Sequence, residues 1–137
     1  MNGSFEHWFS LNRLCMADFP RYGKFPAVYA IRHSTSKDIL KYGNAGCLSQ
    51  RIFVNFIGGF GGRGPSSTTQ FVHWELCGKG MIECVELSWI ETRDKQDAEH
   101  MEKRFRQEYK RLNGCRPLWD RLSMRVFRTQ SFIKSMG

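Results

Sequence analysis

The chain of 137 residues is long enough for one domain with a hydrophobic core but short for two. Hydrophobic residues make up 41% and charged residues 25%, which excludes the composition of a disordered chain. A net charge of +8 and a pI near 9.5 favour a polyanionic partner, of which nucleic acid is the first choice.

The five cysteines are scattered, with no C-x-x-C pair and no histidine at zinc-finger spacing. Neither a disulfide framework nor a structural zinc site is therefore expected, and a reducing compartment is indicated. The first residues lack a signal-peptide pattern, and no window approaches the roughly 20 apolar residues of a membrane span. We expect a cytoplasmic protein without a membrane partner.

The first 24 residues predict a short helix and then a break. In "SFEHWFSLNRLC", aromatic residues and leucines recur at helical intervals after Ser4, a suitable N-cap. Prolines and a glycine at 20, 23 and 26 interrupt the chain. We therefore expect an N-terminal helical extension (1–24) packed on a domain that spans 25–121, and a basic C-terminal extension (122–137).

The first half of the domain predicts a β-hairpin and a buried helix. "PAVYAIRH" and "ILKYGN" are β-branched and aromatic runs separated by the turn-forming "STSKD". The next run, "CLSQRIFVNFIGG", has apolar residues on several faces, so its period does not separate helix from strand. A buried helix is the interpretation we favour.

The second half predicts a loop, a helix, a strand and a long helix. The glycine-rich "GGFGGRGPSSTT" is too irregular for regular structure, and its serines and threonines can cap a helix through "TQFVHWELC". "MIECVELSWIE" alternates like a strand. The fold class expected is α+β, with a small three-stranded antiparallel sheet flanked by helices.

The most clearly signalled element is the helix from Asp94 to Gly114. Asp94 is its N-cap, Asp97 a loose capping-box partner, and Gly114 its terminator. At about 100° per residue, five apolar side chains fall within roughly 80°, with Glu102 at the edge of this stripe: Ala98, Met101, Phe105, Tyr109 and Leu112. Glu102 is either an ordinary partner of Arg106 at i+4 or a functional carboxylate.

Short motifs in a fixed order favour the functional interpretation. "AVYAI", "KYG", "LSQR", "AEHMEKRF" and "RPLWD" together resemble the GIY-YIG nuclease superfamily over residues 25 to 121. Ala27 replaces a signature glycine, Lys41 stands at the position of the second signature tyrosine, and Asp120 stands where asparagine is usual. Because some restriction enzymes of the superfamily carry lysine at this position, the substitution is compatible with catalysis.

The resemblance implies a catalytic set of Tyr29, Arg51 and Glu102, with Lys41 or, after a one-residue shift, Tyr42. Hydrolysis of a phosphodiester needs an activated water and neutralised charge in the transition state. Glu102 would bind Mg²⁺ or Mn²⁺, and Arg51 would hold phosphate oxygens. Tyr29 would hold or deprotonate the water, with Lys41 favouring its phenolate or acting itself.

These assignments predict a divalent-metal-dependent endonuclease that hydrolyses DNA, of the restriction type or selective for DNA structure, with RNA not excluded. The alternative is a non-catalytic nucleic-acid-binding module on the same fold. Basic residues expected to contact the nucleic acid are Arg63 in the glycine-rich loop and Arg104, Lys110 and Arg111 on the long helix. A homodimer is one way in which such a protein would select its target.

Overall fold

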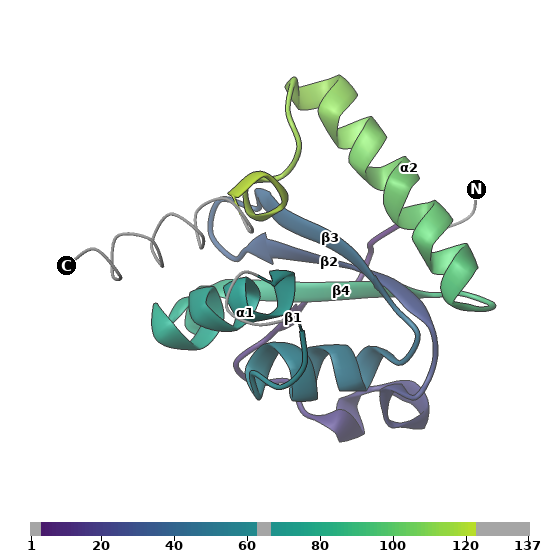
Figure 1. The fold of residues 1–137 in the computed structure, drawn as a ribbon, viewed down its shortest axis with the longest axis vertical. Coiled ribbons are helices and arrows are strands. Elements are labelled where there is room, and N and C mark those ends of the chain that lie inside the picture. The colour runs from purple at the N-terminus through teal and green to yellow at the C-terminus, as the bar shows by residue number, and fades with distance from the viewer. Residues whose placement is uncertain (1–3, 63–66, 123–137) are drawn as a thin grey trace.

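A four-stranded antiparallel sheet organises the protein in the computed structural model, which describes residues 4–62 and 67–122 (Figure 1). The strand order is β1 (Phe9–Ser10), β4 (Val85–Glu91), β2 (Ala27–His33) and β3 (Ile39–Ala45). The expected α+β class is confirmed. The expected number of three strands is wrong, because the N-terminal segment adds β1 beside β4.

Strands β2 and β3 form the predicted hairpin, and β2 lies between β3 and β4 in the sheet. Tyr29 lies opposite Gly43 on one side and Trp89 on the other, so these residues share one face of the sheet. The expected alternation in β4 is confirmed, since Val85 and Leu87 are buried on that same face. Tyr42 points to the opposite face.

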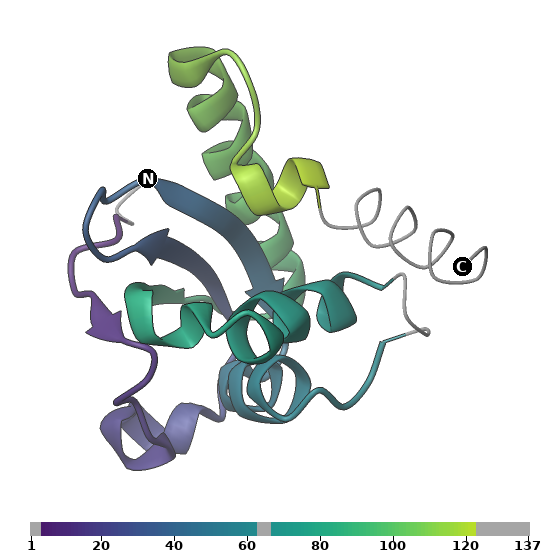
Figure 2. The same ribbon diagram turned by 90° about the vertical axis from the view of Figure 1, so that its left-hand side faces the viewer.

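Helices cover both faces of the sheet (Figures 1 and 2). On the Tyr29 face lie the π-helix η3 (Gln50–Ile57) and α1 (Thr68–His73), which continues into η4 (Trp74–Gly78). On the Tyr42 face, α2 (Lys95–Asn113) packs against β2 and β3. Three short 3-10 turns complete the elements: η1 (Met16–Asp18), η2 (Pro20–Gly23) and η5 (Met81–Cys84).

The local signals for helix ends are confirmed. The Asp94 side chain accepts from the backbone N–H of Asp97, and Gly114 ends α2 with a φ of 80°, a left-handed conformation that glycine adopts without strain. Ser67 caps α1 in the same way through the N–H of Gln70. The run after Cys47 is helical as expected, but its hydrogen bonds are of the i→i+5 type, as between Gly58 N and Phe53 O.

The helix expected in "SFEHWFSLNRLC" is wrong, because this segment runs in an extended path across the sheet. Its aromatic residues contact partners on three different elements, whereas the side chains of one helix face would pack against a single surface. The Phe5 ring lies 4.7 Å from that of Phe105, Trp8 contacts Arg32, and Phe9 stacks on Trp89. Contacts with the domain therefore override the helical spacing of these residues.

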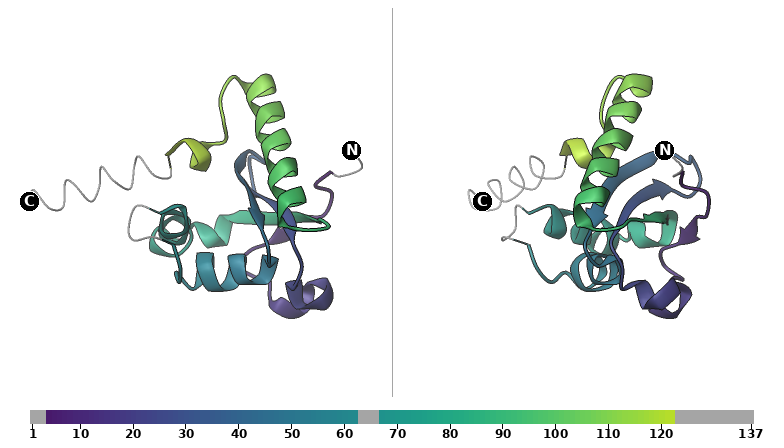
Figure 3. Two further views of the ribbon diagram at one scale, coloured as in Figure 1. Left: turned by 45° about the vertical axis from the view of Figure 1, so that its right-hand side comes forward. Right: turned by 90° about the vertical axis from the view of Figure 1, so that its right-hand side faces the viewer.

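The chain returns to the sheet after α2 through a short helical segment at 118–122, drawn in yellow-green in Figures 1 and 3. Trp119 anchors it, since its side chain is 2% exposed and meets the Phe71 ring edge-on at 6.4 Å. This anchor brings the neighbouring Asp120 beside β3. The expected basic extension lies outside the described residues from 123 onward, and no described helix is both long and apolar enough to cross a membrane.

We predict that Leu11→Ala lowers the free energy of unfolding by about 2 to 5 kcal/mol, because Leu11 is 1% exposed and its removal leaves a cavity in the core. Leu112→Ala is the matched control, since that leucine is 66% exposed and should change stability by no more than about 0.5 kcal/mol. Denaturant unfolding monitored by circular dichroism measures both. Equal effects would show that the N-terminal segment is not part of the cooperative core.

Candidate functional site

A polar pocket of about 340 Å³ lies where β2, β3, η3, α2 and the 118–122 segment meet. Four of the five residues predicted as catalytic line it: Tyr29, Lys41, Arg51 and Glu102. Its remaining lining residues are Gly43, Asn44, Phe56, Thr68, Thr69, Arg106, Arg116 and Asp120. The described lining thus contains four cationic and two anionic side chains, and the pocket suits an anionic ligand.

Gly43 makes room for the Tyr29 side chain inside the sheet. The two residues lie opposite each other in the β2–β3 register. A Cβ atom on Gly43 would lie 2.3 Å from both Cζ and the hydroxyl oxygen of Tyr29, far inside van der Waals contact. Any larger residue would displace the phenol, so the glycine that ends the predicted strand motif has a steric reason to be there.

Burial raises the pKa of the Tyr29 hydroxyl well above its ordinary range. The Arg51 guanidinium opposes this shift, while the carboxylates of Glu102 and Asp120 add to it. The expectation that Lys41 favours a Tyr29 phenolate stays a prediction. The raised pKa favours the neutral phenol, which can donate a hydrogen bond or orient a water molecule.

Lys41 forms a buried ion pair with Asp120. Its Nζ lies 3.1 Å from Asp120 Oδ1, and the two side chains are 6% and 3% exposed. The same carboxylate accepts from Arg106 Nη2 at 3.0 Å and, through Oδ2, from the backbone N–H of Tyr42 at 3.3 Å. Asp120 thereby links β3, α2 and the 118–122 segment, and it holds the Lys41 ammonium at the pocket wall.

Glu102 is held from two sides. Arg106 Nη1 lies 3.0 Å from its Oε1, and Asn44 Nδ2 donates to its Oε2 at 3.0 Å. The simple i+4 pairing with Arg106 is thus present, and Glu102 nevertheless lines the pocket. Oε1 is thus in an ion pair and Oε2 accepts one hydrogen bond, and the carboxylate keeps further acceptor capacity.

The described lining of the pocket offers a metal ion two carboxylates, those of Glu102 and Asp120. Within residues 4–62 and 67–122, no group of three or more His, Cys, Asp or Glu residues is placed to hold a metal ion. Glu102 is the carboxylate that is more exposed in the pocket, at 13% against 3% for Asp120. Because Mg²⁺ commonly binds through one or two carboxylates and keeps several waters, Glu102 is chemically suited to it.

Arg51 and Arg116 are the two cations of the pocket that have no anionic partner among the described residues. Arg51 is the one predicted from the sequence. Its Nε is buried and makes no hydrogen bond in this part of the chain. The i→i+5 pattern of η3 stacks residues five apart, and accordingly Arg51 and Phe56 both line the pocket. A buried guanidinium donor without a partner can bind an oxyanion such as phosphate or a carboxylate.

Tyr42 does not line the pocket. It is 8% exposed and its ring stacks on Phe105 at 5.5 Å and on Phe5 at 5.9 Å, on the opposite face of the sheet. Lys41 and Tyr42 were the two candidates for the second tyrosine position of the signature, and of these Lys41 lines the pocket. Tyr42 contributes its backbone N–H and C=O, which bind Asp120 and Arg106.

The basic residues expected to contact nucleic acid lie away from the pocket lining. Arg104, Lys110 and Arg111 are exposed on α2. At about 100° per residue, Arg104 and Arg111 lie roughly opposite Glu102 around the helix. Arg111 donates through Nε to Glu108 at 3.1 Å. Arg63 falls outside the described residues.

Sequence patterns did not identify Asn44, Arg106, Thr69 or Arg116 as members of the site. Arg106 was visible only as an i+4 partner of Glu102, and its second carboxylate contact comes from a segment 14 residues later in the chain. Asn44 directly follows Gly43 and could have been found from the position of that motif. Thr69 and Arg116 carry no local signal, since folding alone brings them to the pocket.

Comparisons with protein-family models, curated proteins and solved structures yield no match for this chain. The likeness to GIY-YIG nucleases consequently rests on the motifs and on the pocket, and it remains a hypothesis.

We predict that Asp120→Ala lowers the free energy of unfolding by about 3 to 5 kcal/mol, because it leaves the buried Lys41 ammonium without its anionic partner. Adding Lys41→Met to this variant should recover part of the loss, with a coupling energy of about 0.5 to 3 kcal/mol. Denaturant unfolding of the two single variants and the double variant measures that coupling. Asp38→Ala, at an exposed aspartate, is the control, and strictly additive effects would contradict the pair.

The buried phenols predict a loss of stability in alkali. A raised folded-state pKa gives stability that is complete below the unfolded value of about 10 and is lost as pH rises through the folded value. Burial likewise raises the pKa of Tyr42 to about 12. Phenolate absorbance, taken as the difference between wild type and Tyr29→Phe or Tyr42→Phe, should therefore develop well above pH 10. A Tyr29 difference signal centred at or below about 10 would show a stabilised phenolate.

Proposed function

We propose that the protein is a divalent-metal-dependent endonuclease that hydrolyses phosphodiester bonds in DNA. One observation carries the proposal: Tyr29, Lys41, Arg51 and Glu102, separated along the chain, line one pocket. Their functional groups are the ones that phosphodiester hydrolysis requires, namely a phosphate-binding guanidinium, a carboxylate and polar groups that orient water. The resemblance to GIY-YIG nucleases agrees with this set.

In this mechanism Arg51 binds the non-bridging oxygens of the phosphate. Its guanidinium stays charged at any working pH and matches the geometry of phosphate oxygens. The protonated Tyr29 hydroxyl orients the attacking water. The oxygen of this water forms the new bond to phosphorus while the bond to the leaving oxygen breaks; the water loses its proton to solvent, and the leaving oxygen takes up a proton from solvent. Lys41, fixed by Asp120, places positive charge beside the developing negative charge.

Glu102 is the residue that would hold Mg²⁺ or Mn²⁺, with Arg106 and Asn44 orienting its carboxylate. When bound, such an ion supplies Lewis-acid polarisation of the phosphate and stabilises the leaving oxygen.

A non-catalytic nucleic-acid-binding module is the second candidate, and the charge of the pocket favours it. Arg106 contacts both carboxylates, and the cations outnumber the anions. Such a pocket would hold a phosphate without cutting it. Both the endonuclease and the binding module would bind DNA, so a binding measurement does not separate them. An assay of DNA cleavage does.

DNA is the partner that we propose, with RNA as the alternative, and either a monomer or a homodimer is compatible with the pocket. All five cysteines are free thiols, which suits the reducing conditions of the cytoplasm.

Glu102→Gln tests the proposed function most directly. The change keeps size and helix propensity but removes the negative charge that holds a hard cation, so metal-dependent cutting of plasmid DNA should fall by about 10²-fold or more. DNA binding should persist or tighten, because a negative charge near the phosphate is gone. Gel assays with Mg²⁺ or Mn²⁺ measure cutting, and fluorescence anisotropy measures binding.

Glu108→Gln is the matched control on the same helix. Glu108 pairs with Arg111 on the exposed side of α2, so its neutralisation should leave cutting intact. If both variants cut at the wild-type rate, Glu102 is not a metal ligand. If the wild type binds DNA but cuts none with either metal, the binding module is the correct candidate.

A further inference from the structure

Two further cavities adjoin the pocket along the beginning of η3. The first, of about 310 Å³, shares Arg51 with the pocket as a common lining residue. The second, of about 470 Å³, shares Cys47 and Gln50 with the first. These shared residues place the three spaces next to one another, from the pocket toward the N-terminal turns, and we call the surface that lines the two outer cavities the η3 groove.

The lining of the two outer cavities carries positive charge without any acidic residue among the described side chains. Arg51 and Lys95 line the first, and Lys24 lines the second. Lys24 and Lys95 are exposed, and within the described residues neither forms an ion pair. Cations left unpaired along a groove are suited to a chain of phosphates.

The walls of the groove change in character along its length. Near the pocket they carry the side-chain amides of Gln50 and Asn55, which can both donate and accept hydrogen bonds. Farther away they are apolar, with Met16, Phe53 and Val54. A positive groove with amide and aromatic or aliphatic walls is the kind of surface that binds single-stranded nucleic acid, with phosphates on the cations and bases on the apolar side chains.

The geometry points to the η3 groove as the binding site of one single strand of DNA that leaves the pocket. This inference rests on the proposed function and makes it more specific. The substrate is a DNA that carries a single-stranded arm, so the enzyme selects DNA structure and is not of the restriction type. Arg51 belongs to both the pocket and the groove, and it fixes the phosphate from which the arm extends.

Binding of a labelled single-stranded oligonucleotide of about 12 nucleotides tests the inference, since single-strand sites commonly span a comparable length. The full chain is titrated in chelator, so that no strand is cut, over a range of salt concentrations. Lys24→Ala/Lys95→Ala should weaken binding about tenfold and lower the salt slope by about 1.4, near 0.7 for each phosphate contact. Gln50→Glu, at an exposed residue between the outer cavities, should also weaken it.

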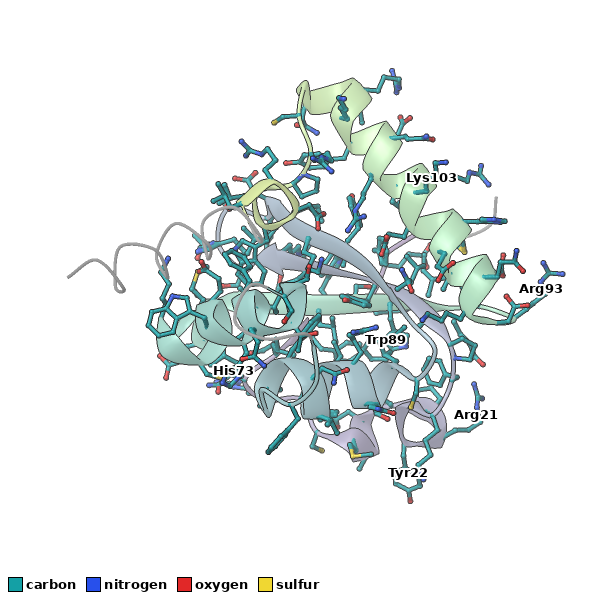
Figure 4. All side chains as sticks on the ribbon, viewed as in Figure 1. Arg21, Tyr22, His73, Trp89, Arg93 and Lys103 are labelled. Atoms are coloured by element: carbon teal, nitrogen blue, oxygen red, sulfur yellow. The ribbon has the colours of Figure 1, made fainter. Side chains whose placement is uncertain are left out.

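Lys103→Ala is the matched control, because this exposed lysine projects from α2 away from the groove (Figure 4). It should leave affinity and salt slope unchanged. Wild-type affinity in the double variant overturns the inference, as does an equal loss in Lys103→Ala, which would indicate diffuse attraction by surface charge. In either case, plasmid cutting by the wild type would leave the proposed function standing. A wild type that binds neither this oligonucleotide nor a duplex refutes both.

Discussion

The pocket depends on the hydrogen bonds and ion pairs that the buried carboxylate of Asp120 makes. This carboxylate accepts hydrogen bonds from the Lys41 ammonium, the Arg106 guanidinium and the Tyr42 backbone N–H, and its side chain is 3% exposed. These donors belong to β3 and α2, while Asp120 itself follows Trp119 in the segment that closes the pocket. Because a buried charge without a partner is strongly unfavourable, the three elements can assemble only in an arrangement that satisfies this carboxylate.

The same network divides the cations of the pocket into two groups. Lys41 and Arg106 form ion pairs with carboxylates, and these pairs fix the positions of both cations and of Glu102. Arg51 and Arg116 have no such partner among the described residues, and their charge remains available to a ligand. An anion that enters the pocket therefore meets two unpaired guanidinium groups beside side chains that are already fixed, and this arrangement limits the reorganisation needed on binding.

The sequence predicted best those features that neighbouring residues determine. The caps of α2, the β2–β3 hairpin and Gly43 all follow from local steric and hydrogen-bonding rules. Prediction failed where contacts between residues far apart in the chain determine the structure. Phe5 and Trp8 have helical spacing but pack on α2 and β2, and Arg106 gains its second carboxylate from a later segment. The raised pKa of Tyr29 follows from burial, which no motif reveals.

The structure gives a physical reason to consider two departures from the GIY-YIG pattern together. A lysine at position 41 buries a positive charge that a tyrosine would not, and an asparagine at 120 could not neutralise it. Asp120 supplies the missing negative charge at 3.1 Å from Lys41 Nζ. The two residues therefore depend on each other for stability: a change at either one alone would leave a buried charge without its partner. The charge-matched pair keeps the pocket polar and closely packed.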